Sequence, residues 1–324
     1  MIEAVRQRRR TALAKSLRRA GRRVVSMLRI VFLAGMCFTI VYPLLTKITM
    51  SVMDERDVFD KTVKTIPKHF NFTNFYEVWK LVDFQTVLTN NVKLSLLSAA
   101  LQTFFCIVVG YGFAKFRFRF RGLLFTLVVL CMVVPPEIII TPLYLNFRNF
   151  DPFGLVGMIN GGRGLDLLQG YLPFILLSVT ATAPRNALYI FLARQYYRGL
   201  PREINEAAAI DGAGPFRTFF FLMLPSSVPI MVTVFLFTFV YQWNDVLYSS
   251  LFFNELTTIP KVLYNFGYYT TYVFSTISVN TNKIGYVGIL HSALTLMGIA
   301  PLVILYAVLQ KSFIRTIERT GLVD

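Results

Sequence analysis

The 324-residue sequence has few of the side chains that enzymes most often use for catalysis. It contains three cysteines and two histidines, and Cys37, Cys106 and Cys131 show no spacing typical of metal ligands. The motifs of zinc proteases (HExxH), phosphate-binding loops (GxxxxGK[ST]) and serine hydrolases (GxSxG) are absent from the sequence. We therefore expect no catalytic residue, no metal site and no cofactor in this chain. His291 is expected to be a packing residue.

Charge is also scarce, because 15% of the residues are charged and 55% are hydrophobic. With a mean hydropathy of +0.56, the chain is too apolar for a soluble domain and predicts an all-α protein that crosses a membrane several times. A span needs about 20 apolar residues to cross the hydrocarbon core. Six segments have this length: residues 25–47, 92–114, 122–145, 171–193, 226–250 and 289–310.

The net charge of +16 could indicate a nucleic-acid partner, but its placement indicates membrane topology instead. Residues 1–29 hold ten basic side chains and one acidic one, and the loop 115–121 is purely basic, whereas residues 47–91 carry six of each sign. Basic residues accumulate on the cytoplasmic side of a membrane. We therefore expect both termini, the loop 115–121 and the segment 194–225 in the cytoplasm. For the basic N-terminal tail, contact with anionic lipid is favoured over a specific partner.

These observations predict how the chain is organised. The expected parts are a basic cytoplasmic tail (1–24), a first transmembrane helix that is retained rather than cleaved (25–47), an outer loop (48–91), a transmembrane core (92–312) and a cytoplasmic tail (313–324).

A polar, helix-forming segment, residues 199–225, interrupts the apolar core. Pro201 suits the start of a helix, and the residues that follow it are good helix formers. Residues 211–214, Asp-Gly-Ala-Gly, end that helix, and Pro215 can begin a second one. The sequence thus predicts two short helices at the membrane surface, exposed to another protein.

Within this segment, Glu206-Ala207-Ala208, Gly212 four residues later and residues 222–225 (Leu-Met-Leu-Pro) resemble the cytoplasmic coupling motif of ABC-importer permeases. Four further stretches, 111–118, 134–137, 191–197 and 242–245, are similar to the maltose-type, carbohydrate-importing branch of that family. The alternative is a plain amphipathic helix at the membrane surface.

The resemblance implies a type I importer permease with six transmembrane helices in a bacterial inner membrane. It also implies four partners: a second, homologous permease, two ATP-binding subunits that bind ATP and magnesium, and an extracytoplasmic solute-binding protein. Glu206 would contact the ATP-binding subunit, Ala207 and Ala208 would permit close approach, and Asp211 and Gly212 would form the turn. Glu206 could instead only solvate a helix face.

Arg185, between Pro184 and Asn186, is an ionisable residue inside an expected span, where charge usually faces a cavity or a partner. One hypothesis is that Arg185, together with Asn186, lines the transport path, where the arginine would meet an anionic sugar. The other is that Arg185 pairs with a carboxylate or reaches the membrane surface. Glu137, after two prolines, is expected at a break in the third span, as a gate or as an arginine's partner.

A polar and aromatic group follows near the outer end of the fifth span. An indole or phenol ring stacks on a sugar ring, and amides and carboxylates bond to its hydroxyls. The other interpretation is an aromatic belt at the membrane interface, with the carboxylate capping a helix or pairing between helices. The residues of this group are Tyr241, Trp243, Asn244, Asp245 and Tyr248.

The leading hypothesis is therefore a subunit that imports an oligosaccharide. Arg185 and the basic balance favour acidic sugars, of the alginate or pectin type, over neutral ones. A peptide or amino-acid permease would share the coupling motif but should lack the stretches 111–118 and 242–245. A membrane glycosyltransferase would need paired carboxylates or a metal-binding loop, and the cytoplasmic loops contain neither.

Overall fold

The computed structural model describes residues 2–159, 161–201, 203–210, 212–268 and 284–319, and in these ranges the regular structure is helical. Two isolated antiparallel bridges, Met53 with Phe70 and Phe150 with Leu165, are the exceptions there. The chain divides into two compact units. The first comprises Met1–Phe75 with Thr281–Leu296, and the second Tyr76–Asn280 with Met297–Asp324.

The first unit contains the long helix α1 (Ile2–Ser51) and the short helix α2 (Glu55–Phe59). The loop after α2 is organised around Asp57, whose side chain is buried. Asp57 Oδ2 accepts hydrogen bonds from the backbone N–H groups of Lys68 (2.6 Å) and His69 (2.7 Å). These bonds favour the carboxylate and hold the pKa of Asp57 below its usual value.

The first part of α17 (Ile284–Arg319) also belongs to this unit. Val58 approaches Gly285 closely, and a Cβ at position 285 would collide with a Val58 methyl carbon. His291 Nδ1 lies 3.4 Å from Lys47 Nζ, and its backbone oxygen accepts from the Thr295 hydroxyl at 2.7 Å. His291 thus contributes to the packing of this unit, as the sequence predicts.

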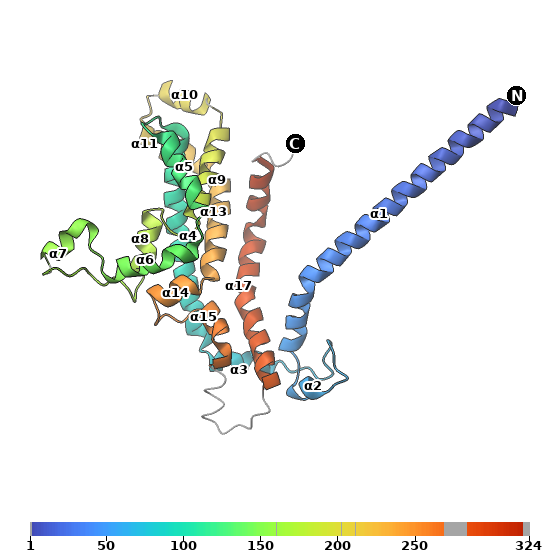
Figure 1. Cartoon of the computed structure of the whole chain (residues 1–324), viewed down its shortest axis with the longest axis horizontal. Helices are drawn as coiled ribbons and strands as arrows, with labels where there is room; N and C mark the ends of the chain where they lie inside the picture. The colour runs from blue at the N-terminus through green and yellow to red at the C-terminus, as the bar shows by residue number, and fades with distance from the viewer. Residues whose placement is uncertain (1, 160, 202, 211, 269–283, 320–324) are drawn as a thin grey trace. The chain divides into compact units, whose positions relative to one another are not determined.

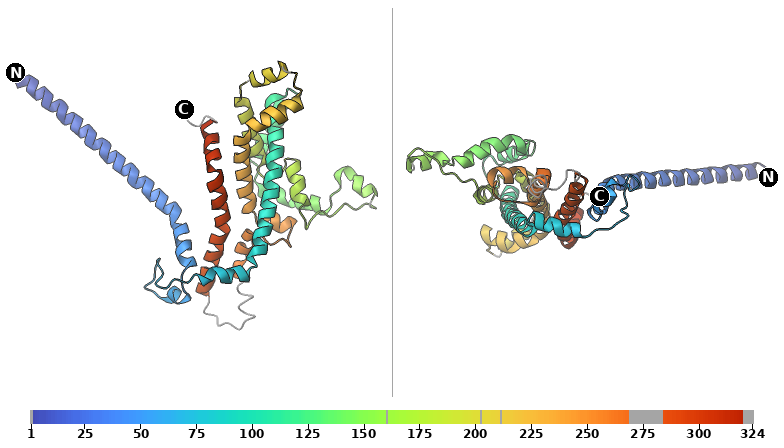
Figure 2. Two further views of the ribbon diagram at one scale, coloured as in Figure 1. Left: turned by 180° about the vertical axis from the view of Figure 1, so that it is seen from behind. Right: turned by 90° about the horizontal axis from the view of Figure 1, so that it is seen from below.

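The second unit is built around α4 (Phe84–Lys115), which packs against four other helices (Figures 1 and 2). These are α8 (Leu172–Val179), α9 (Asn186–Gly199), α13 (Val228–Trp243) and α15 (Ile259–Tyr264). The remaining helices are α3 (Thr73–Leu81), which begins at the boundary between the units, α5 (Arg121–Cys131), α6 (Pro136–Arg148), η1 (Pro152–Gly154), α7 (Leu155–Ile159), α10 (Glu203–Ile210), α11 (Pro215–Thr218), the π-helical η2 (Phe219–Met223), α12 (Leu224–Ser226) and α14 (Leu247–Phe252).

Helices α4 and α9 approach each other closely at Gly110. A Cβ at this position would lie 2.5 Å from Ala193 Cβ and 3.0 Å from the backbone nitrogen of Arg194. Small residues at such crossings are typical of helix pairs in membranes. The surrounding core includes Tyr111, whose ring contacts the rings of both Tyr197 and Phe219.

Three helical stretches in the described residues are long and apolar enough to cross a membrane: Arg23–Ser51, Phe84–Lys115 and Gly285–Gln310. Two bent pairs reach the same length, α5 with α6 and the α11–α12 segment with α13, with bends of 103° and 72°. The expected span 122–145 is therefore not straight. Its bend falls just before Pro136, because proline suits the first turn of a helix but cannot continue one.

The expected span 171–193 is two helices rather than one. Helix α8 ends at Val179 and α9 begins at Asn186. Between them, Ala181 (φ 55°) and Arg185 (φ 68°) have left-handed backbone conformations, which non-glycine residues rarely adopt. Pro184 contributes to the break because it has no N–H to donate to a helix. This conformation places Arg185 at the start of α9.

Candidate functional site

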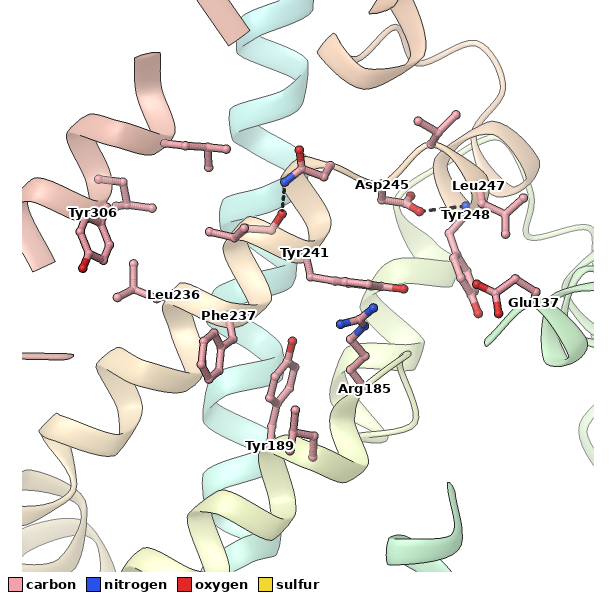
Figure 3. Close-up of a pocket in the computed structure, with 16 residues that line it drawn as sticks. Glu137, Arg185, Tyr189, Leu236, Phe237, Tyr241, Asp245, Leu247, Tyr248 and Tyr306 are labelled. Carbon is pink, nitrogen blue, oxygen red and sulfur yellow. Dashed lines mark hydrogen bonds between the residues drawn. The ribbon is translucent and has the colours of Figure 1, made fainter. Parts of the chain in front are cut away.

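A cavity of about 790 Å³ lies within the second unit (Figure 3), a size typical of small-ligand sites. It is formed by α6, α9, α13, α14 and the second part of α17. Its polar lining residues are Glu137, Arg185, Tyr189, Tyr241, Asn244, Asp245, Tyr248 and Tyr306. Its apolar lining residues are Leu188, Leu236, Phe237, Val240, Val246, Leu247, Leu302 and Leu305. Tyrosines and one arginine thus give a mainly apolar cavity several hydrogen-bonding groups.

Arg185 reaches into this cavity from the break between α8 and α9 (Figure 3). Its guanidinium carbon lies 4.4 Å from the centre of the Tyr241 ring, a cation–π arrangement that orients the side chain. The ion pairs found in the described part of the chain lie in the loop 54–69 and do not involve Arg185. The positive charge is therefore held in place without being neutralised by a carboxylate at contact distance.

The cavity wall on α13 follows the helical repeat. Phe237, Val240, Tyr241 and Asn244 are spaced three or four residues apart, so they share one face of the helix. Asn244 donates a hydrogen bond from its side-chain amide to the Val240 carbonyl at 2.7 Å. This bond leaves the amide oxygen of Asn244 as an acceptor for a ligand hydroxyl.

Asp245 lines the cavity, but its carboxylate is used by the chain itself. Its Oδ1 accepts from the backbone N–H of Tyr248 at 3.1 Å, and its Oδ2 from that of Ser249 at 2.7 Å. It therefore caps the start of α14, which is the structural alternative considered for this residue. The Tyr248 hydroxyl donates to the backbone oxygen of Pro136 at 3.1 Å and connects α14 to the bend before α6.

Two residues proposed for the substrate path lie off the cavity. Trp243 is 2% exposed; its Nε1 donates to the Gly298 carbonyl at 3.2 Å, and its ring stacks on Phe239 at 5.4 Å. Asn186 is 1% exposed and sits in the first turn of α9. Both side chains lie within the helix packing.

Three polar residues that were not in the predicted site line the cavity: Glu137, Tyr189 and Tyr306. Tyr189 follows Arg185 by four residues, a spacing that puts both on one helix face and that the sequence displays. Glu137 lies in the first turn of α6, directly after the bend between α5 and α6, as expected from the prolines before it. Tyr306 has no comparable local signal, because only the position of α17 brings it here.

The polar segment 199–225 contains α10 and α11, separated by a turn at Gly212 with a φ of +71°. Glu206 is exposed, whereas Ala208 is buried within the chain, so its small side chain permits close packing of α10 on its own core. Ala207 lies in α10, and Asp211 lies outside the described residues. Ile210 and Phe216, on either side of the turn, are more than four-fifths exposed.

Comparison with known proteins identifies the class to which this fold and cavity belong. Residues 106–318 match the family model described as "Binding-protein-dependent transport system inner membrane component". The chain is 27% identical over 289 residues to the "Probable ABC transporter permease protein YurM" of Bacillus subtilis (strain 168), a match that covers 89% of this chain and 85% of that protein. It is 29% identical over 222 residues to the sn-glycerol-3-phosphate transport system permease protein UgpE of Pectobacterium atrosepticum, which covers 67% of this chain and 72% of UgpE.

Among solved structures, the chain resembles one from a bacterial ABC transporter involved in the import of the acidic polysaccharide alginate. The TM-score is 0.68 at 22% sequence identity, covering 90% of this chain and 97% of the other. Since the family model matches more than half of the sequence, the chain belongs to the family of inner membrane components of binding-protein-dependent transport systems. It is a permease of an ABC importer, as the coupling motif predicts.

Proposed function

We propose that this chain is one of two permease subunits of an importer that carries an oligosaccharide, and that the cavity around Arg185 is its part of the transport path. Arg185 carries this proposal, because it presents a positive charge in a cavity whose other polar groups are mostly tyrosine hydroxyls. Hydroxyl and amide groups suit the many hydroxyls of a sugar, and a guanidinium suits a carboxylate. An acidic oligosaccharide, of the alginate or pectin type, matches both.

The charges in the cavity also suggest how such a sugar would lie. Glu137 has the opposite sign to Arg185 and would repel a carboxylate, but it can accept hydrogen bonds from sugar hydroxyls. Asp245 is already bonded to two backbone N–H groups. A sugar carboxylate would therefore face Arg185 and Tyr241, while the hydroxyls of the same or the next residue would face Glu137.

A second candidate is a small phosphate ester. The relative from Pectobacterium is a transport system permease for sn-glycerol-3-phosphate, and an arginine binds phosphate as well as carboxylate. The cavity volume of about 790 Å³ is large for so small a solute. We favour the oligosaccharide for this reason.

The further parts of the proposal concern the membrane and the partners. The three long helices, the two bent pairs and the α8–α9 pair would give six spans, with both termini and α10 in the cytoplasm. The exposed Glu206 and the apolar Ile210 and Phe216 suit a segment that is bound by an ATP-binding subunit, with Gly212 as its turn. A second, homologous permease would complete the path, and a solute-binding protein would deliver the sugar.

The test is uptake of two oligosaccharides of equal length, one acidic and one neutral, into proteoliposomes that contain the whole transporter. Arg185→Ala should reduce uptake of the acidic sugar about ten- to a hundredfold more than that of the neutral one, because a charge-assisted hydrogen bond contributes about 1.5–3 kcal/mol. Arg185→Lys should recover part of the loss, since lysine keeps the charge but not the planar, two-pronged contact.

Arg163→Ala is the matched control, because this arginine does not line the cavity. It should leave the ratio of the two uptake rates unchanged. An equal loss for both sugars in Arg185→Ala would show that Arg185 is structural, and preferential loss of sn-glycerol 3-phosphate uptake would favour the second candidate.

A further inference from the structure

Phenylalanine and arginine alternate through residues 116–121, which join α4 to α5. The three phenylalanines are 43–61% exposed. Arg121 donates from a terminal guanidinium nitrogen to the Phe116 carbonyl at 3.0 Å, and the Arg119 guanidinium lies 5.0 Å from the centre of the Phe120 ring. The turn therefore combines exposed aromatic rings with positive charges held close to them.

Helix α9 places two further arginines, Arg194 and Arg198, near this turn. Helix α5 packs against α9, and the guanidinium carbon of Arg194 lies 3.7 Å from the centre of the Phe125 ring, one turn after Arg121 on α5. Arg198 follows Arg194 by one turn on α9, and Arg121 precedes Phe125 by one turn on α5, so the three arginines lie near one another where the two helices pack. The guanidinium Nε of Arg194 is buried without a hydrogen-bond partner.

Nothing of opposite sign compensates these charges within the described part of the chain, where the ion pairs lie in the loop 54–69. Like charges this close repel one another, and an anion bound between them would remove that repulsion. We propose that Arg121, Arg194 and Arg198 bind the phosphate group of an anionic phospholipid, and that the phenylalanines of the 116–121 turn contact its glycerol and upper acyl chains.

The aromatic surroundings favour a lipid over the other anions. Free phosphate would gain nothing from exposed phenylalanine rings, whereas aromatic side chains concentrate at the membrane–water interface and basic pockets between transmembrane helices bind lipid headgroups. An acidic surface of an ATP-binding subunit would meet the arginines but would leave the rings of the turn exposed to water. The site is independent of the solute that the transporter carries.

Native mass spectrometry of the whole transporter, titrated with phosphatidylglycerol or phosphatidylcholine, tests this proposal. Phosphatidylglycerol should bind at a saturable site and phosphatidylcholine should not replace it. Removal of both charges with Arg194→Gln and Arg198→Gln should weaken phosphatidylglycerol binding about fivefold for each arginine, since a basic residue near an anionic surface contributes about 1 kcal/mol. Arg217→Gln, on the expected cytoplasmic side in α11, is the matched control and should leave this binding unchanged.

If the neutral variants fail to assemble, Arg194→Lys is the alternative variant, because it keeps the positive charge. It should weaken phosphatidylglycerol binding by less than Arg194→Gln. Three results would overturn the proposal: unchanged phosphatidylglycerol binding in the double variant, displacement of the lipid by millimolar inorganic phosphate, or loss of the ATP-binding subunits with lipid binding intact. The last two would assign the arginines to a free anion or to a protein partner.

Discussion

The close contact between α4 and α9 can be tested by moving one methyl group from α9 to α4, with the substitutions Gly110→Ala and Ala193→Gly. In Gly110→Ala, the new Cβ would lie 2.5 Å from Ala193 Cβ and 3.0 Å from the Arg194 backbone nitrogen, neither of which can rotate away. The helices must therefore separate. Overpacking of this kind costs about 1–3 kcal/mol, reduced by up to about 1 kcal/mol because alanine favours a helix more than glycine does.

The reverse change, Ala193→Gly, loses a buried methyl worth about 0.8 kcal/mol and adds about 1 kcal/mol of helix propensity cost. If the two changes were independent, their sum would be about 2–5 kcal/mol. In the double variant the propensity terms cancel and the clashing methyl is absent. Two backbone approaches remain, 3.0 Å to the Arg194 nitrogen and 3.2 Å to the carbonyl carbon of residue 193. The stability of the double variant should therefore lie within about 1 kcal/mol of wild type.

The assay is the thermal unfolding midpoint of the assembled transporter in detergent for all four members of the cycle. Both single variants should melt below wild type, and the double variant should return close to it. A double variant that melts as low as the sum of the two single changes would refute the close contact between α4 and α9.

Trp243→Phe should lower the unfolding midpoint, because it removes a hydrogen bond from the indole N–H to Gly298 that contributes about 1 kcal/mol. The apparent KM for the sugar should not change, since this N–H does not face the cavity; a raised KM at unchanged stability would show that the indole contacts the substrate. Asp57 has a lowered pKa, so its contribution to the stability of the loop 54–69 should be present above pH 3.8 and lost as the pH falls below it. The hydrogen-exchange protection factors of the two amides that it binds should decrease there, and at neutral pH in Asp57→Asn; pH-independent protection factors would contradict this. Glu206→Lys and Gly212→Val should each reduce ATP-driven uptake while the transporter assembles at normal levels. Gly212→Val should do so because valine resists the backbone φ of +71°. Uptake at the wild-type rate by both variants would show that this segment does not couple the subunits.

Local sequence signals predict one break in the helices and several of the polar residues of the cavity. Prolines indicate the break before α6, because proline lacks the N–H that a helix needs. The sequence does not show how sharply α5 and α6 turn, 103°, since this angle depends on the packing of other helices. Nor does it show that α8 and α9 are separate helices, because the left-handed Ala181 and Arg185 are held by tertiary structure.

In the aromatic cluster at the end of α13, helical spacing predicts which side chains face the cavity, but it does not identify cavity residues from other helices. Tyr241 and Trp243 differ by two residues, about 200° around a helix, so both cannot face one cavity. Helical spacing from Phe237 and Val240 selects Tyr241 and Asn244 for the cavity side. Tyr306 could not be found in this way, because it reaches the cavity through a contact between segments far apart in the sequence.

The central claim is that this permease carries an oligosaccharide, and one measurement tests it most directly. Proteoliposomes that contain the complete transporter, with ATP inside and its solute-binding protein outside, are supplied with labelled acidic oligosaccharide and, in parallel, with labelled sn-glycerol 3-phosphate. The account predicts accumulation of the oligosaccharide that requires both ATP and the binding protein. Accumulation of sn-glycerol 3-phosphate with no uptake of oligosaccharide would contradict it.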